Sequence, residues 1–416
     1  MASVGVNWAG VVVTLSEAET KTLESVGQDI NNISKALDGM IGSATVAGVP
    51  IGLVIKVLAA YILLFMSVVA MVDKGNGVQL TLPLLAINFG QYWLVIPTPV
   101  SGATGSITVR RSTGSDFGSG PGANQDWSHG PCSGSVGTFF ADVTGDGKAD
   151  VILVNRDTIC VRRSTGNDFG AGMSANEDWS HGPCFGTRGT YFADVDGDGK
   201  AECILVNDDT ICVRRSTGSD FGPGISANED WSHGPCFGTR GTFFADVDGD
   251  GRADCILVNN DTICVRRSTG SDFGPGPGAN EDWTHGASFG SLGTYFADVT
   301  GDGKADLILV NPNTICVRRS TGSDFGPGPG ANEDWTHGAS FGSLGTYFAD
   351  VTGNGKADLI LVNPNTICVR RSTGSDFGPG PGANEDWTHG AYYGNKGTFF
   401  SSVTGGKIAH AIVVNG

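Results

Sequence analysis

Basic residues are scarce in this chain, and the shortage limits the partners that it can bind. Its 416 residues include 26 Lys and Arg against 43 Asp and Glu, a formal net charge of −17. Residues 1–100 hold six acids and four bases, so −15 of that charge falls on the rest. A body of this sign repels phosphate groups. The composition therefore argues against nucleic acid or anionic lipid as the main partner.

Cysteine motifs are also missing, although the chain has ten cysteines. The sequence contains no CxxC pair and no Cys–His cluster, which argues against zinc. The cysteines recur at equivalent places of a repeat, and other copies hold Thr108, Ser288, Val151 or Leu307 there. Since cysteine is interchanged with ordinary packing residues, we expect no disulfide framework.

A secretory signal peptide is not indicated either. Residues Met1–Gly5 carry no basic residue of the kind that opens such a leader. We expect a cytosolic store or leaderless release, followed by action at the surface of a target cell.

Helical periodicity is absent from residues 105–416, where one 52-residue unit is written six times without insertion. The marker Val-Arg-Arg begins at Val109, Val161, Val213, Val265, Val317 and Val369. Each copy reads as three short strands, such as 241–247, 253–258 and 262–267, and a fourth is expected at 281–285. Four strands in about fifty residues is the size of one propeller blade.

The two ends of the repeat region complete each other. Gly397–Val414 supplies the first two strands of a unit, and Ser106–Ser112 supplies the third. Pairing them closes the ring and removes exposed sheet edges. The sequence therefore predicts a mainly β fold, a six-bladed β-propeller over residues 105–416.

Five of the six copies carry an acidic loop, which reads Asp-Val-Asp-Gly-Asp-Gly-x-Ala-acid in two copies; the other three have Thr at position 3, and the last of these also has Asn at position 5. Oxygen ligands at loop positions 1, 3, 5 and 9, a backbone carbonyl at 7 and Gly at 6 suit Ca²⁺. The candidate ligands are Asp142, Asp146 and Asp150; Asp194, Asp196, Asp198 and Glu202; Asp246, Asp248, Asp250 and Asp254; Asp298, Asp302 and Asp306; and Asp350, Asn354 and Asp358. The sixth copy has Ser402, Gly406 and His410 at positions 1, 5 and 9 and is expected to bind no ion.

Two interpretations of these loops are open. Asp-Gly-Asp-Gly is also a common turn sequence between strands. Five copies with ligand spacing favour a metal, and we expect it to be structural because the loop offers no base or nucleophile.

A second candidate site is the segment Trp-x-His-Gly, which recurs in every copy. Its members are Trp127 and His129, Trp179 and His181, Trp231 and His233, Trp283 and His285, Trp335 and His337, and Trp387 and His389. Trp offers a flat face and an N–H to a sugar, and His offers a hydrogen-bond donor or acceptor. The alternative is that each Trp is a core wedge between blades, with His bonded to a neighbouring carbonyl.

The acidic loops resemble the FG-GAP/VCBS repeats of calcium-binding β-propellers, as in integrin α-subunit heads and many secreted bacterial proteins. The Trp strand followed by Phe-x-Ala-Asp-(Val/Leu)-Thr-Gly-Asp-Gly also resembles the mushroom lectin family of Psathyrella velutina. The resemblance covers residues 105–416 and implies a propeller that binds terminal N-acetylglucosamine between blades. This chain departs from those lectins in having Asp-Trp-Ser/Thr-His-Gly and Ile-Leu-Val-Asn for their Gly-Trp-Arg-Val and Val-Gly-Phe-Gly.

Residues 1–104 read as a separate, small helical and hydrophobic domain. A capping box at Ser16–Glu19 precedes apolar residues spaced three and four apart from Leu23 to Met40, which predicts an amphipathic helix suited to helix pairing. The run 44–72 holds only one charge, Lys56, and is long enough to span a bilayer. Strands are expected at Val78–Leu82 and Tyr92–Ile96.

Three roles are open for the run 44–72. It is a buried helix of a small domain or oligomer core, a segment that enters a membrane after surface binding, or a permanent anchor. The internal Lys56 and the lack of flanking positive clusters disfavour the anchor.

These features together predict a multivalent, lectin-like propeller that binds cell-surface glycans, is stabilised by Ca²⁺, and carries an oligomerising, pore-forming N-terminal domain in a homo-oligomer. The chief alternative is an adhesion or scaffold propeller with protein partners. An enzyme is disfavoured, because a hydrolase needs a singular acid or nucleophile and nearly every polar residue here is repeated.

Overall fold

The structure, a computed structural model, divides into two compact units, Met1–Thr104 and Gly105–Gly416. In the first unit it describes residues 3–7, 10–15, 35–37, 45–46, 49–50, 78–82 and 96–99. In the second unit it describes residues 105–118, 125–128, 130–170, 177–222, 228–274, 280–326, 332–378, 385–388 and 393–416.

The described part of the first unit consists mainly of strands. Strands β1 (Ser3–Asn7), β2 (Gly10–Leu15), β5 (Val78–Leu82) and β6 (Ile96–Pro99) form an antiparallel sheet in that order. Strands β3 (Thr45–Val46) and β4 (Val49–Pro50) form a two-stranded ribbon. The predicted strand Val78–Leu82 is confirmed, whereas β6 begins at Ile96, where the second predicted strand ends.

The prediction of a helical N-terminal domain is therefore not supported. Among the described residues of this unit only 35–37 are helical, and Leu37 there is buried. Strands prevail at Ser3–Leu15 because valines recur through both segments, and β-branched side chains favour a pleated surface. The rest of the predicted amphipathic helix and the run 51–77 lie outside the described residues. In the described ranges, no helix has the length and apolar character needed to cross a bilayer.

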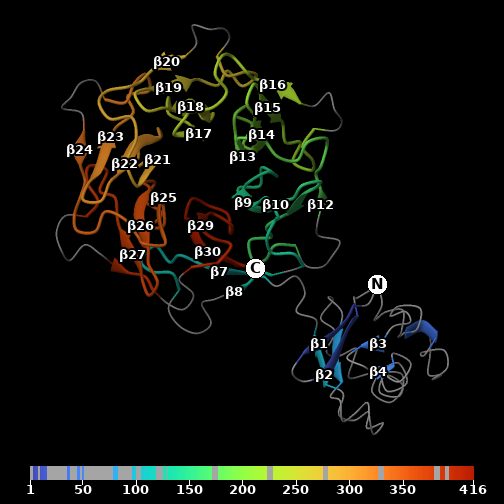
Figure 1. Cartoon of the computed structure of the whole chain (residues 1–416). Coiled ribbons are helices and arrows are strands. Elements are labelled where there is room, and N and C mark those ends of the chain that lie inside the picture. The colour runs from blue at the N-terminus through green and yellow to red at the C-terminus, as the bar shows by residue number, and fades with distance from the viewer. Residues whose placement is uncertain are drawn as a thin grey trace. The chain divides into compact units, whose positions relative to one another are not determined.

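The second unit is a six-bladed β-propeller, as predicted (Figure 1). Blade 1 comprises β9 (Gly137–Ala141), β10 (Asp150–Val154), β11 (Ile159–Arg162) and β12 (Glu177–Asp178). Blade 2 comprises β13 (Gly189–Ala193), β14 (Glu202–Val206), β15 (Ile211–Arg214) and β16 (Glu229–Asp230). Blade 3 comprises β17 (Gly241–Ala245), β18 (Asp254–Val258), β19 (Ile263–Arg266) and β20 (Glu281–Asp282). Blade 4 comprises β21 (Gly293–Ala297), β22 (Asp306–Val310), β23 (Ile315–Arg318) and β24 (Glu333–Asp334). Blade 5 comprises β25 (Gly345–Ala349), β26 (Asp358–Val362), β27 (Ile367–Arg370) and β28 (Glu385–Asp386).

Blade 6 joins the two ends of the repeat region, as the sequence predicts. Its strands are β29 (Gly397–Ser401), β30 (His410–Asn415), β7 (Ser106–Arg110) and β8 (Gln125–Asp126). Strand β30 pairs antiparallel with β7, with Ile412 opposite Val109. The ring therefore closes through main-chain hydrogen bonds between segments about 300 residues apart, as Figure 1 shows.

The fourth strand of each blade is shorter than expected. In blade 3 it covers Glu281–Asp282 and not 281–285. The Thr284 N–H donates to Oδ1 of Asp282 at 3.0 Å, which turns the chain out of the sheet directly after the strand.

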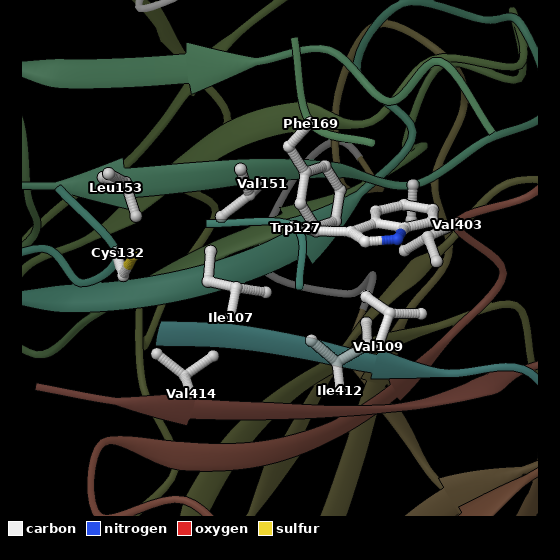
Figure 2. Packing of buried hydrophobic residues seen from close by; sticks show 11 residues of the cluster. Ile107, Val109, Trp127, Cys132, Val151, Leu153, Phe169, Val403, Ile412 and Val414 are labelled. Atoms are coloured by element: carbon white, nitrogen blue, oxygen red, sulfur yellow. The ribbon is translucent and has the colours of Figure 1, made fainter. Parts of the chain in front are cut away.

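The hydrophobic core lies between adjacent blades. All five residues of each second strand of blades 1 to 5 are buried: an acid at the first position and four apolar residues after it. Figure 2 shows the junction of blades 6 and 1, where Val109 and Ile412 of one blade pack with Val151 and Leu153 of the next. All ten cysteines lie within the described residues and are free thiols, in line with the expectation of no disulfides.

The closing blade should contribute to stability as strongly as an internal one. Ile412 and Ile256 occupy equivalent positions in blades 6 and 3, and both are fully buried. Changing either residue to Ala should lower the free energy of unfolding by about 2–5 kcal/mol, through lost burial and the cavity that remains. Chemical denaturation of Ile412→Ala and Ile256→Ala checks this. If Ile412→Ala keeps the wild-type free energy of unfolding while Ile256→Ala is destabilised, ring closure is contradicted.

Candidate functional site

The acidic loops all join the first strand of a blade to the second, so they lie at one end of the propeller. Each loop is bonded to the next one around the ring. The Ala201 N–H donates to the Asp142 carbonyl at 2.7 Å, and the same bond recurs between the later loops. Ala149 N–H to the Ser402 carbonyl, also 2.7 Å, closes the circle. The loops are therefore linked into one ring of main-chain hydrogen bonds.

The aspartate at loop position 1 shapes the turn. Oδ1 of Asp194 accepts the Gly197 N–H at 2.7 Å, and Oδ2 accepts the Gly199 N–H at 2.9 Å. Gly197 and Gly199 have φ of 81° and 86°, a backbone region that residues other than Gly rarely adopt. Both oxygens keep a further lone pair, so this carboxylate remains available to a cation.

The acid at position 9 is fully buried in each of the five acidic loops. In blade 1, Asp150 accepts N–H bonds from Val143 at 3.2 Å and Ser164 at 2.7 Å. Desolvation outweighs these bonds and raises the pKa of Asp150 to about 7, and that of Glu202 to about 8. A nearby cation would offset this cost.

Loops 2 and 3 differ from the others at position 3, where they have an Asp. Asp196 pairs with Arg215 at 3.0 Å, and Asp248 pairs with Arg267 at 3.5 Å. The equivalent residue in loop 1 is Thr144, whose hydroxyl donates to Asp142 at 3.3 Å. The extra carboxylate of loops 2 and 3 is thus matched by an arginine from the same blade.

Within the described residues, carboxylates converge closely enough to hold one ion in two loops only. Asp194, Asp196 and Glu202 in loop 2, and Asp246, Asp248 and Asp250 in loop 3, bring ligand atoms within 4.8 Å of one another. These are the two loops with three aspartates at positions 1, 3 and 5. Their oxygen-only donor sets fit a hard cation such as Ca²⁺.

Two other predicted ligands of loops 2 and 3, Asp198 and Asp254, lie outside the two carboxylate clusters. Asp198 bonds Lys200, and Asp254 accepts N–H bonds from Val247 and Ser268. The remaining candidates do not form a comparable cluster among the described residues. They are Asp142, Asp146 and Asp150; Asp298, Asp302 and Asp306; and Asp350, Asn354 and Asp358. Loss of the position-3 carboxylate leaves these loops fewer charges to bring together.

The sixth loop uses a histidine where the others use an acid. Nδ1 of His410 accepts the Ser112 N–H at 2.9 Å, so the ring proton lies on Nε2, 2.6 Å from the Thr404 hydroxyl. Burial, with a smaller effect from Arg111, lowers the pKa of His410 to about 4. The Ser402 hydroxyl donates to the Gly406 carbonyl. A neutral imidazole thus accepts the Ser112 N–H, just as the position-9 carboxylate accepts the N–H of the equivalent Ser in blades 1 to 5.

The tryptophans of the Trp-x-His-Gly segment do not offer a face to a sugar, which corrects that prediction. Trp127, Trp179, Trp231, Trp283, Trp335 and Trp387 are each 1% exposed. The rings of Trp231 and Phe273 pack in a T-shaped arrangement with their centroids 4.9 Å apart, and the guanidinium of Arg215 lies 5.5 Å from the centre of the Trp231 ring. Its N–H donates to Glu229 at 3.0 Å. The alternative interpretation, a core wedge between blades, describes these residues.

The histidines of the same segment are partly accessible and bridge neighbouring blades. His181 lies 2.5 Å from Asp220, and both side chains are about 30% exposed (28% and 30%). His233 with Asp272, His285 with Asp324, and His337 with Asp376 repeat this pair. His129 and His389 lie outside the described residues. The partner is an Asp, not the carbonyl considered from the sequence.

Sequence reasoning missed these aspartates, although a signal was available. The turn Ser-Thr-Gly-Ser/Asn-Asp-Phe recurs with the same 52-residue step as the histidines. The Asp of this turn lies 39 residues after the His that it pairs with, in the following repeat.

A buried arginine lies close to the glycine that follows His181, His233 and His285. Arg214 is fully buried, and its Nε donates to Asn228 at 2.5 Å. A Cβ on Gly182 would lie 2.8 Å from its Nη2, which explains why Gly follows His in this segment. The second arginine of the pair, Arg215, is half-buried and bonds Glu229 with two nitrogens, at 2.8 and 3.1 Å.

The repeats match a known sequence family. The FG-GAP-like repeat family matches residues 142–205, 194–257, 246–309 and 298–361, which together span 142–361 and more than half of the chain. Each match begins at the position-1 Asp of one loop and ends in the second strand of the next blade. No curated protein sequence matches this chain.

Several solved structures are similar to the chain. A lectin of Agrocybe aegerita, described as recognising non-reducing terminal N-acetylglucosamine, is 20% identical with a TM-score of 0.44, covering 68% of this chain and 77% of its own. The Tc holotoxin pore of Photorhabdus luminescens is 16% identical with a TM-score of 0.45, over 67% of this chain and 14% of the toxin chain. The biofilm matrix protein Bap1 of V. cholerae is 16% identical with a TM-score of 0.24, over 65% and 42%. Values this low carry no functional inference.

The core position of the tryptophans predicts a large stability loss on truncation. Trp231→Ala should lower the free energy of unfolding by about 3–5 kcal/mol, because a fully packed aromatic wedge is removed. Phe185→Ala is the matched control and should cost far less, since Phe185 is 38% exposed. Thermal and urea unfolding of the two variants checks this. Small and equal losses in the free energy of unfolding of the two variants would contradict the role of Trp231 as a core wedge between blades.

The buried histidine of the sixth loop predicts a loss of stability in acid. The unfolded chain protonates this residue near pH 6.5, whereas the folded protein resists protonation until about pH 4. The contribution of His410 to the free energy of unfolding should therefore fall by up to roughly 3 kcal/mol as the pH drops from 6.5 to about 4, whereas the raised pKa values of Asp150 and Glu202 act in the opposite direction. Urea unfolding of the wild type and of His410→Asn, whose amide oxygen can still accept the Ser112 N–H, isolates this contribution. Identical pH profiles would contradict it.

Proposed function

We propose that this chain, which belongs to the FG-GAP-like repeat family, is a calcium-stabilised propeller that binds cell-surface glycans at several equivalent sites. The observation that carries the proposal is the half-buried His–Asp pair, present between four successive pairs of neighbouring repeats in the described residues. One polar motif repeated around a rigid ring suits a ligand that is itself repeated on a surface.

Calcium has a structural role in this proposal. Asp194, Asp196 and Glu202 would hold one ion in loop 2, and Asp246, Asp248 and Asp250 a second in loop 3. When bound, the ion neutralises carboxylates that the fold has forced together. The loop-to-loop bonds from Ala to Asp would then transmit the gain in order to neighbouring blades.

Glycan suits the His–Asp pairs because both groups are hydrogen-bonding and only partly covered. An imidazole nitrogen and a carboxylate oxygen together offer a donor and acceptors to adjacent sugar hydroxyls. Single sites of this size bind weakly. Several sites engaging one surface gain by effective concentration, without any new contact.

Binding rather than catalysis is favoured by the repetition itself. The His–Asp pairs are equivalent, and none of the four described pairs has a repeat-specific nucleophile as its hydrogen-bond partner. A scaffold propeller with protein partners is the second candidate, favoured by the exposed aromatic residues Phe341 and Tyr393. In either case residues 1–104 are proposed to self-associate and, through 44–72, to enter the target membrane as a pore-forming unit.

The calcium proposal predicts a melting temperature that depends on free calcium. A ligand bound only by the native state stabilises it by about 2.7 kcal/mol per site at a hundredfold excess over Kd. Excess EDTA should therefore lower the melting temperature, and added Ca²⁺ should restore it. Asp246→Asn should lose part of this response, whereas Asp230→Asn, exposed and outside the loops, should keep it. Superimposable melting curves with and without EDTA would refute the metal.

The glycan proposal predicts graded loss of avidity. Asp272→Asn breaks one His–Asp pair and should weaken binding to a glycan-coated surface severalfold without abolishing it, because the other sites remain. Asp261→Asn, in an exposed hairpin turn, is the matched control. A glycan array in calcium buffer identifies the sugar. Silence of the wild-type protein across all glycan classes would favour the protein-binding scaffold instead.

A further inference from the structure

The exposed apolar side chains of the propeller gather at one register of the repeat. Within the described residues, the large hydrophobic side chains that are exposed are Val136, Phe185, Leu292, Phe341, Leu344 and Tyr393. All six belong to the short turn that precedes the first strand of a blade, such as Phe341-Gly342-Ser343-Leu344 before β25. The acidic loops follow the same strands at their other end. This rim is therefore at the opposite end of the blades from the metal loops.

The rim changes character around the ring because the residue directly before the first strand differs between blades: it is Val136 in blade 1, Arg in blades 2 and 3, Leu in blades 4 and 5, and Lys396 in blade 6. In blades 2 and 3 the residue before the strand is Arg188 or Arg240. Each guanidinium covers the Phe of the next turn, Phe237 at 4.3 Å and Phe289 at 4.2 Å. In blades 4 and 5 the same position holds Leu292 or Leu344, and the aromatic residues that follow in register, Phe341 and Tyr393, are 42% and 47% exposed.

The hairpin turns beside these residues change in the same way. Blades 2 and 3 present Asp208 and Asp209, and Asn260 and Asp261, at the exposed tips. Blades 4 and 5 present Pro312 and Asn313, and Pro364 and Asn365. The repeats are otherwise nearly identical, so both substitutions remove charge from the same sector of one face.

We call six exposed residues of these turns and hairpin tips the apolar rim: Leu292, Pro312, Phe341, Leu344, Pro364 and Tyr393. The Leu292 N–H bonds the Val310 carbonyl at 3.0 Å, on one side of the blade 4 hairpin. On the other side, the hydroxyl of Ser340, next to Phe341, donates to the Pro312 carbonyl at 2.8 Å. The hairpin thus links the Leu of one turn to the aromatic residue of the next.

We propose that the apolar rim docks onto the surface of a zwitterionic lipid bilayer, a binding activity separate from the proposed glycan recognition. The four exposed Leu and aromatic side chains, 42–47% accessible, offer on the order of 300 Å². A stable protein dimer needs roughly 800 Å² from each partner. A second copy of this chain would also bring a propeller of the same strong negative charge.

A neutral lipid surface meets both conditions. It accepts a few projecting Leu, Phe and Tyr side chains without a complementary groove, and aromatic residues favour the headgroup region. Its lack of net charge avoids repulsion by the acidic body, which an anionic surface would suffer. The rim carries neither the acids nor the arginines that its counterpart in blades 2 and 3 presents.

The repeats themselves supply the test variants. Leu292→Arg with Leu344→Arg installs the residue that blades 2 and 3 already carry at this position, so the fold should be kept. The full chain is sedimented with glycan-free phosphatidylcholine vesicles. We expect the double variant to partition at least about tenfold less than the wild type, because two apolar anchors are replaced by charge. The melting temperature of each protein, measured in the same buffer, reports folding.

The matched control reverses the exchange. Arg188→Leu with Arg240→Leu extends the apolar rim and should raise partitioning, and phosphatidylserine vesicles should bind the wild type less than phosphatidylcholine. Wild-type protein that stays in solution, or equal partitioning of wild type and Leu→Arg variant, overturns the proposal. The proposal is also overturned if the Leu→Arg variant has a lower mass by light scattering than the wild type but binds vesicles equally well. The rim would then be a contact between copies of the chain. Glycan binding is measured separately on the array. A negative vesicle result therefore does not decide the glycan proposal.

Discussion

The packing of one blade against the next is the constraint on which the propeller depends. A four-stranded blade has two apolar faces, and each face is buried only when a neighbour covers it. The same aromatic pair occurs at every junction: a Trp from one repeat packs in a T-shaped arrangement with a Phe from the next repeat around the ring, as Trp179 does with Phe221, with the ring centroids 4.9 Å apart. Because every blade needs two neighbours, a gap at any junction would expose a core, and the ring must close.

The architecture was predictable because it follows from spacing alone. A strict 52-residue step, and ends that supply complementary strands, specify six blades and the joint between β30 and β7. The candidate metal loops were predictable in position for the same reason. Which carboxylates converge was not, because it depends on where each side chain lies in the fold: Glu202 joins the cluster of loop 2 and Asp254 stays outside that of loop 3, although each accepts two backbone N–H bonds.

The ligand site was harder to predict because burial depends on neighbours that the local sequence does not name. Trp231 and His233 stand two residues apart, yet the first is enclosed by Phe273 and Arg215 and the second is partly open beside Asp272. In the N-terminal unit, the sequence did not predict the described strand pair of β1 and β2, which is rich in valine. Most of the helix predicted between Leu23 and Met40 lies outside the described residues. Short β segments compete poorly with a long periodic pattern when only the sequence is read.

Divergence between near-identical repeats carries the remaining functional information. Asp replaces Thr at position 3 in loops 2 and 3, and Leu replaces Arg at the rim of blades 4 and 5, so the converging carboxylates and the two Leu side chains each lie in neighbouring blades of the ring. The most direct test of this account is native mass spectrometry of the protein titrated with calcium. Two ions should bind first, at loops 2 and 3, before any further uptake. Absence of bound calcium, or uptake of five equivalent ions without preference, would contradict it.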